Sequence, residues 1–146
     1  MKTNTRCLEC DRLLTKGIFD LSLEVFNHPL CAQHQAELIE SGASEQTIYL
    51  YLALRSRKLP VVIGYFDGNY PVDIAIPGKL HIEVDSHYNE DYRHTRVPTI
   101  IIPKSLFNNP HAFRKTVDQL VTACEPFISR SLFYHLAQTL SIVQMQ

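Results

Sequence analysis

Four residues near the N-terminus form two close pairs of soft metal ligands. They are Cys7 and Cys10 in the segment C-L-E-C, and Cys31 and His34 in the segment C-A-Q-H. Zinc takes four thiolate or imidazole ligands in a tetrahedron, and a two-residue spacer lets one tight turn present two of them. The spacing therefore predicts a structural zinc site. Four protein ligands leave no position for water, so we expect a structural or nucleic-acid-contacting role rather than catalysis at this metal.

The length of the chain predicts a second, larger unit. The 146 residues are enough for one domain of about 100 residues and a small appendage that cannot fold on apolar burial alone. We expect a zinc-finger module over residues 1–40. The linker S-G-A-S follows at 41–44, and the main domain, with an additional C-terminal helix, occupies residues 41–146.

The predicted order of elements in the first module resembles a treble-clef zinc finger. A knuckle carries the first ligand pair, a hairpin is expected through residues 18–26, and the second pair begins a helix at residues 32–39. The resemblance implies zinc. Treble clefs serve as DNA grips, protein-docking modules and structural plugs, so the resemblance leaves the role of the module open.

Composition predicts a globular chain without a membrane span. Hydrophobic residues make up 45% and charged residues 20%, and no stretch approaches the roughly 20 apolar residues of a spanning helix. The polar start M-K-T-N-T-R predicts no signal peptide, so we expect a cytoplasmic protein in a reducing compartment. Cys124 lies in an apolar helical pattern and is expected to be a small buried hydrophobe.

A formal net charge of −1 indicates that any nucleic-acid contact must be local rather than spread over a basic surface. Two short basic runs are candidates for phosphate contacts. Their residues are Arg55, Arg57 and Lys58 in the first run, and Arg93 and Arg96 in the second. The alternative is a solvated helix end, where cations complement the helix dipole.

Beyond the linker, a helix capped by Ser44 and ended by Pro60 precedes three strand-like segments. The segments lie at residues 61–66, 70–76 and 80–85. Pairing apolar with apolar side chains predicts the register of the last two. The predicted pairs are Ile76 with Leu80, Ile74 with Ile82, and Val72 with Val84.

This register puts Asp73 directly opposite Glu83. Like charges on neighbouring strands are destabilising unless a positive charge lies between them, and a divalent cation would supply it. The alternative is a solvated sheet face on which the carboxylates repel weakly through water.

The segments P-V-D-I-A-I-P at 71–77 and H-I-E-V-D at 81–85 resemble the core of the PD-(D/E)xK, or restriction-endonuclease-like, superfamily. They are most similar to very-short-patch-repair-like endonuclease domains and RAP domains, over roughly residues 44–124. The resemblance implies an α+β core of a helix, a three-stranded antiparallel meander, a strand and a helix. Residues 99–102 serve as the fourth strand and 110–124 as the following helix, while residues 86–98 are short for the intervening helix.

By this resemblance, Asp73 and Glu83 match the metal-binding acids of a nuclease that uses Mg²⁺ or Mn²⁺. Asp85 stands where typical members carry lysine. His87, or His81, is the candidate for proton transfer. The implied function is phosphodiester hydrolysis of nucleic acid, DNA more than RNA. The alternative is a catalytically inactive nucleic-acid-binding or protein-interaction module on the same fold.

The last segment, residues 125–146, shows apolar residues at helical spacing. These residues are Ile128, Leu132, Leu136, Leu140 and Val143. The expected helix either packs on the sheet or forms the interface of a homodimer.

Overall fold

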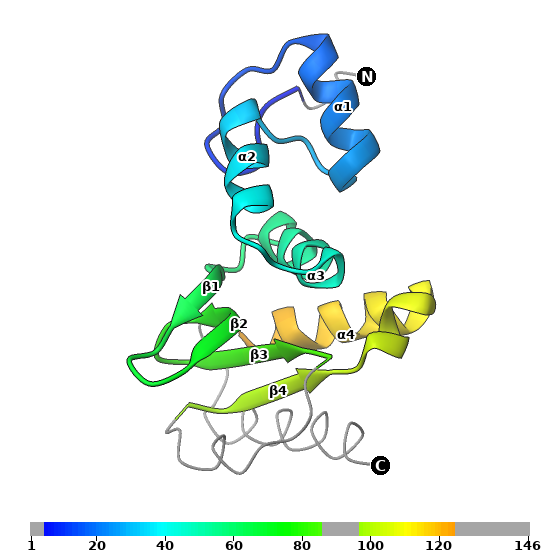
Figure 1. Cartoon of the computed structure of the whole chain (residues 1–146). Helices are drawn as coiled ribbons and strands as arrows, with labels where there is room; N and C mark the ends of the chain where they lie inside the picture. The colour runs from blue at the N-terminus through cyan, green and yellow to red at the C-terminus, as the bar shows by residue number, and fades with distance from the viewer. Residues whose placement is uncertain (1–4, 86–96, 125–146) are drawn as a thin grey trace.

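The computed structural model describes residues 5–85 and 97–124 of the chain. Over these ranges the protein is a mixed α+β fold (Figure 1). The helices are α1 (Lys16–Phe26), α2 (Ala32–Glu40), α3 (Glu45–Ser56), the 3₁₀ helix η2 (Lys104–Asn108) and α4 (Pro110–Ala123). The strands are β1 (Val62–Phe66), β2 (Pro71–Ile76), β3 (Leu80–Val84) and β4 (Thr99–Ile102). No helix in the described ranges has the length and apolar character that crossing a membrane requires.

The strands form one mixed sheet in the order β1-β2-β3-β4. The first three strands are an antiparallel meander, and β4 runs parallel to β3. Ile74 pairs with Ile82 and Ile76 with Leu80, which confirms the register predicted from apolar alternation. Pro77 at the second position and Gly78, with a φ of 78°, at the third give the connecting turn a type II pattern.

One face of the sheet carries the core. Apolar side chains of β2, β3 and β4 on this face are buried with apolar side chains of α3 and α4. They include Ile74, Ile82 and Ile100 from the sheet, Leu50 and Leu54 from α3, and Phe113, Val117 and Leu120 from α4. The opposite face carries Asp73, Ala75, His81, Glu83 and Ile101, because side chains alternate along each strand.

Side-chain caps fix where α3 and α4 begin. The Ser44 hydroxyl accepts a hydrogen bond from the backbone amide of Thr47, and Asn109 Oδ1 accepts one from the amide of Ala112. Such caps satisfy backbone donors that have no partner inside the helix. Both helices therefore start where the sequence predicts, and Pro110 occupies the first turn of α4, where its missing N–H costs nothing.

The predicted hairpin through residues 18–26 is wrong, because this segment is the helix α1. Its apolar residues alternate with polar ones at Leu21, Leu23 and Val25, a period typical of a strand. These three side chains are exposed, whereas Ser22 and Phe26, four residues apart, are buried. Thr15 caps the helix by accepting a hydrogen bond from the Ile18 amide, and the helical period decides the structure.

The edge strand β1 is irregular beside Asp73. Gly64 has a φ of 65°, and the pairs Ile63 with Ile74 and Tyr65 with Val72 continue on either side of it. The register places Gly64 next to Asp73 across the two strands. Glycine adopts this left-handed conformation without a steric penalty, and such irregularities bend a strand locally.

Several sequence predictions lie outside the described residues. They are the segment of residues 86–96 with His87, Arg93 and Arg96, and the C-terminal helix of residues 125–146 with its homodimer interface. They stay predictions.

The Gly64 conformation predicts opposite effects for two glycine substitutions. Gly64→Ala should lower the free energy of unfolding by about 1–2 kcal/mol, because a side chain in the left-handed region is strained. Gly17→Ala, at an open position in α1, should leave stability unchanged or raise it by up to about 1 kcal/mol. Urea denaturation of both variants measures the difference, and equal effects would contradict the assigned φ of Gly64.

Candidate metal centre and carboxylate pair

The structure brings the four predicted zinc ligands together near the N-terminus. The three sulfurs and one imidazole nitrogen all lie within 4.8 Å of one another. Nδ1 of His34 is 3.1 Å from the Cys31 sulfur and 3.6 Å from the Cys7 sulfur. The sulfurs of Cys10 and Cys31 are 3.9 Å apart. In residues 5–85 and 97–124, this Cys₃His cluster is the one group of three or more such side chains with metal-ligand geometry.

These separations fit a tetrahedral zinc site. A Zn–S bond of about 2.3 Å separates two thiolates by about 3.8 Å, and a Zn–N bond of about 2.0 Å separates nitrogen from sulfur by about 3.5 Å. The observed 3.9 Å between sulfurs, and 3.1 and 3.6 Å from nitrogen to sulfur, lie close to these values. Three thiolates and one imidazole are ligands that suit zinc. The cluster can therefore bind zinc.

Two local structures present the ligand pairs. The first pair lies in a knuckle closed by an antiparallel bridge between Arg6 and Leu13, in which the Cys7 amide donates to the Arg12 carbonyl over 2.8 Å. Cys31 is the N-cap of α2, and His34 follows in its first turn. A knuckle and a helix start are the treble-clef elements that the sequence predicts, without the predicted hairpin between them.

The thiols of the cluster perturb one another. Burial would raise the pKa of Cys7, but hydrogen bonds from backbone amides of the knuckle and of Cys31 outweigh it and lower the pKa to about 7. The Arg12 amide lowers the pKa of Cys10, while desolvation and the neighbouring thiols raise it above its ordinary value. Adjacent thiolates oppose one another's ionisation, and a bound cation removes this opposition.

A carboxylate contacts the remaining nitrogen of the histidine ligand. Nε2 of His34 is 3.8 Å from Glu37 Oε2, one turn along α2, while Nδ1 faces the sulfurs. In metal sites, a carboxylate hydrogen-bonded at this nitrogen orients the imidazole and selects the tautomer that leaves the other nitrogen for the metal. Glu37 lies near this position, beyond hydrogen-bond distance.

Glu9, in the spacer between Cys7 and Cys10, anchors the knuckle to α3. Its Oε1 accepts a hydrogen bond from Arg55 Nε over 2.9 Å, and its Oε2 accepts one from the Tyr51 hydroxyl over 3.3 Å. Burial, together with the Glu9 charge, raises the pKa of Tyr51 to about 12. The phenol therefore stays a donor across the ordinary pH range.

The acids of the predicted catalytic site do not form one three-carboxylate group. Glu83 is buried on β3. Asp73 is half-buried on β2, with Oδ2 accepting the Val84 amide over 2.8 Å. Continuing the observed register by one pair puts Asp73 beside Glu83. Asp85 follows β3 in a left-handed conformation, with a φ of 57°, and is exposed.

His81 lies on the same sheet face, two residues before Glu83. It is buried, and its ring centroid is 6.1 Å from that of Tyr65. Burial lowers the pKa of His81, and the charge of Asp67 opposes this shift in part. The imidazole is therefore neutral at pH 7.

Two of the basic residues predicted to contact nucleic acid have intramolecular carboxylate partners. Arg55 pairs with Glu9, and Arg57 Nη1 lies 2.6 Å from Asp118 on α4. Lys58 is exposed at the end of α3 in a left-handed conformation. Cys124, predicted to be a buried small hydrophobe, is half-buried against the core, and burial raises its pKa to about 11.

Sequence reasoning missed the residues that join distant segments. Glu9 and Arg55 are 46 positions apart, and no spacing rule relates them. The one available signal is the carboxylate inside the C-L-E-C spacer, because the spacer side chains of a knuckle project away from the metal ligands toward neighbouring elements.

Comparisons of the chain with protein-family models, with curated proteins and with solved structures find no match. The residues of the chain and their geometry therefore carry the functional argument.

Removing one thiol of the cluster should abolish stoichiometric zinc binding. Cys10→Ala leaves three ligands and should lose the metal and lower the melting temperature, since binding energy of a structural zinc is folding energy. Cys124→Ala is the matched control, because this cysteine lies outside the cluster and should retain one zinc per chain. Elemental analysis after dialysis measures the metal, and equal zinc content in both variants would contradict the site.

Breaking the Glu9 anchor should cost more than breaking an exposed ion pair. Glu9→Gln should lower the free energy of unfolding by about 1–3 kcal/mol, because Glu9 and Arg55 are largely buried and hydrogen-bonded. Asp118→Asn removes the exposed Arg57 pair and should cost less than about 1 kcal/mol. Chemical denaturation of the zinc-loaded variants makes the comparison, and a larger loss for Asp118→Asn would contradict it.

Proposed function

We propose that the protein is a metal-dependent nuclease, in which Asp73 and Glu83 hold Mg²⁺ or Mn²⁺ on a restriction-endonuclease-like core and the Cys₃His cluster holds a structural zinc. The observation that carries this proposal is the strand register. Continued by one pair, the register of Ile74 with Ile82 puts Asp73 and Glu83 side by side on two central strands, on the sheet face away from α3 and α4.

The position of this pair suits a cation. Glu83 is buried and Asp73 half-buried, and two carboxylates on neighbouring strands repel one another. Carboxylate oxygens are the ligands that magnesium and manganese prefer, and these ions serve phosphoryl chemistry. A cation bound here would relieve the repulsion.

The surrounding residues suit such a site. The Val84 amide fixes one oxygen of Asp73, which leaves the other oxygen to a ligand. Gly64 beside it has no side chain, and no atom of the described residues lies within 4 Å of where its Cβ would be, so none of these residues blocks access from the edge strand there. When bound, the cation would polarise a phosphate and lower the pKa of a water.

His81 is the described residue best suited to accept a proton on this face. Its lowered pKa keeps the imidazole neutral at pH 7, the form in which a ring nitrogen accepts a proton. Asp85 and His87 keep the roles that the family resemblance implies as part of the proposal, and Arg93 and Arg96 stay candidates for phosphate contacts on the basis of their position and charge.

One observation favours a second candidate, a non-catalytic nucleic-acid-binding module on the same fold. Asp85 stands where typical members of the superfamily carry lysine, and it is exposed beyond the end of β3 rather than grouped with Asp73 and Glu83. A cation held by two carboxylates needs further ligands from water or substrate, which weakens binding in the absence of nucleic acid.

The nuclease proposal predicts hydrolysis that depends on both carboxylates. Single- and double-stranded DNA and RNA are incubated with zinc-loaded protein and Mg²⁺ or Mn²⁺, and products are resolved on denaturing gels. Glu83→Gln and Asp73→Asn should each lower the rate by at least about 100-fold, which corresponds to about 2.7 kcal/mol of transition-state stabilisation. Asp20→Asn, at an exposed position on α1, should leave the rate unchanged.

A folded, zinc-loaded wild type that cuts none of these substrates with either metal would reject the nuclease and favour the binding module. Cleavage that survives both carboxylate substitutions would place the reaction elsewhere or identify a contaminant.

A further inference from the structure

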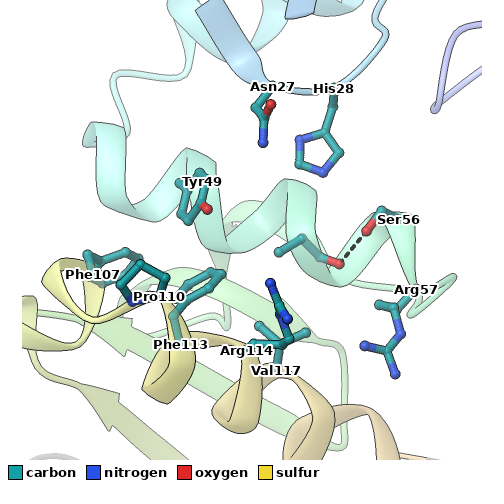
Figure 2. A pocket seen from close by; sticks show the side chains of 11 residues that line it. Asn27, His28, Tyr49, Ser56, Arg57, Phe107, Pro110, Phe113, Arg114 and Val117 are labelled. Atoms are coloured by element: carbon teal, nitrogen blue, oxygen red, sulfur yellow. Dashed lines mark hydrogen bonds between the residues drawn. The ribbon is translucent and has the colours of Figure 1, made fainter.

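A cleft opens between the N-terminal module and the helical layer of the main domain (Figure 2). Its volume is about 310 Å³, near the lower end of the roughly 300–1,000 Å³ typical of small-ligand sites. The loop between α1 and α2 contributes His28, α3 contributes Tyr49 and Arg57, and the first turns of α4 contribute Phe113 and Arg114. The cleft lies on the helical side of the sheet, opposite the face that carries Asp73 and Glu83.

Aromatic rings form one wall of this cleft. Tyr49 and Phe113 have ring centroids 4.8 Å apart with an interplanar angle of 35°, and Phe107 lies 5.5 Å from Phe113. Tyr49 remains 41% exposed although it belongs to this cluster. A part of the Tyr49 ring is thus held in place by its neighbours and still open to a planar ligand.

Two guanidinium groups border the cleft. Arg114 is exposed on α4 and has no carboxylate partner within the described ranges. Arg57 donates one N–H to Asp118 and has four further N–H donors. Among the residues that the structure describes, no aspartate or glutamate lines this cleft. Pro110, the first residue of α4, also lines the cleft, so the positive N-terminal end of the α4 dipole lies there.

A neighbouring cavity shows which end of the cleft can hold an anion. It has a volume of about 650 Å³, shares Asn27, Tyr49 and Phe107 with the cleft, and is lined also by Glu24 and Glu45. Carboxylates repel phosphate, so only the end with Arg57 and Arg114 suits an anion. The aromatic side chains therefore lie between the acidic cavity and the arginine end of the cleft.

The upper rim of the cleft is fixed by a buried hydroxyl. Ser22 of α1 is fully buried, and its Oγ donates to the His28 carbonyl over 2.6 Å and accepts the Leu30 amide over 2.8 Å. Nδ1 of His28 lies 3.0 Å from the Phe26 carbonyl, which leaves Nε2 directed away from that bond. These hydrogen bonds therefore fix the conformation of the α1–α2 loop that forms this rim.

We propose that this cleft binds a nucleoside phosphate, with the base stacked on Tyr49 and the phosphate at Arg114 and Arg57. Stacking on an aromatic ring beside a cation is how proteins hold single-stranded nucleic acid, because every base offers a π-face and every phosphate a charge. The proposal deepens the nucleic-acid side of the proposed function and does not depend on catalysis, since the carboxylate pair lies on the other face of the sheet.

The test measures binding of a short fluorescein-labelled oligothymidylate to the zinc-loaded full chain by anisotropy, without added Mg²⁺ or Mn²⁺. Arg114→Glu should weaken binding by roughly tenfold or more, the size of one strong phosphate or stacking contact. Lys115→Glu is the matched control: the same change of charge, one residue further on α4, at an exposed position that does not line the cleft. It should change the affinity by less than about threefold.

Stacking is tested by two variants of Tyr49. Tyr49→Leu should weaken binding roughly tenfold, and Tyr49→Phe, which keeps an aromatic ring, should bind with about the affinity of the wild type. Competition with unlabelled thymidine monophosphate separates the two sources of this ligand. Displacement only at far higher concentration than the unlabelled oligomer identifies a single strand, and equal potency identifies a free nucleotide.

Equal losses in Arg114→Glu and Lys115→Glu would overturn the proposal, because they would indicate attraction by overall charge. Absence of binding by either ligand would also overturn it. Neither result bears on hydrolysis at Asp73 and Glu83, so failure here and failure of the nuclease proposal are separate outcomes.

Discussion

The Cys₃His cluster brings together the parts of the N-terminal module, and the carboxylate inside its first ligand pair holds this module to the rest of the structure. The module of α1 and α2 buries few apolar side chains, chiefly Phe26, Leu30 and Leu38. A segment of this size cannot offset its conformational entropy with so small a core, and small modules of this kind depend on a metal or another crosslink. The four ligands, drawn from two separate pairs, would supply that crosslink when zinc is bound. Once the knuckle is closed, Glu9 is presented to Arg55 and Tyr51 on α3.

Helix α3 is consequently shared by two parts of the fold. Leu50 and Leu54 face the core with the sheet and α4, while Tyr51 and Arg55 meet Glu9 of the knuckle. Figure 1 shows α3 between the N-terminal module and the sheet. The space left beside α3, where the α1–α2 loop approaches α4, is the cleft lined by Tyr49. Its shape therefore depends on the knuckle that carries Cys7 and Cys10, even though no ligand of the cluster lines it.

The sequence is sufficient for features that rest on local rules. The two-residue spacers identify all four cluster ligands, and alternation with the turn at Gly78 predicts the register of Ile74 with Ile82. The same alternation misleads in α1, where Leu21 and Val25 are exposed and helical capping prevails. Contacts between segments distant in the chain have no such signal. The Glu9 anchor and the aromatic cleft arise only when α1, α3 and α4 meet, so neither could be predicted.

The ion pairs also limit the number of contacts in the nucleic-acid binding that we propose for this chain, whose net charge is −1. Arg55 and Arg57, in the densest basic run, form ion pairs with Glu9 and Asp118. Among the described residues, Arg114 is therefore the main unpaired cation of the cleft. Each neutralised phosphate contributes about −0.7 to the slope of log affinity against log salt for a single strand. One or two contacts therefore give a shallow slope, and aromatic stacking must supply most of the affinity. Such a protein would hold unpaired bases and gain little from the denser charge of a duplex.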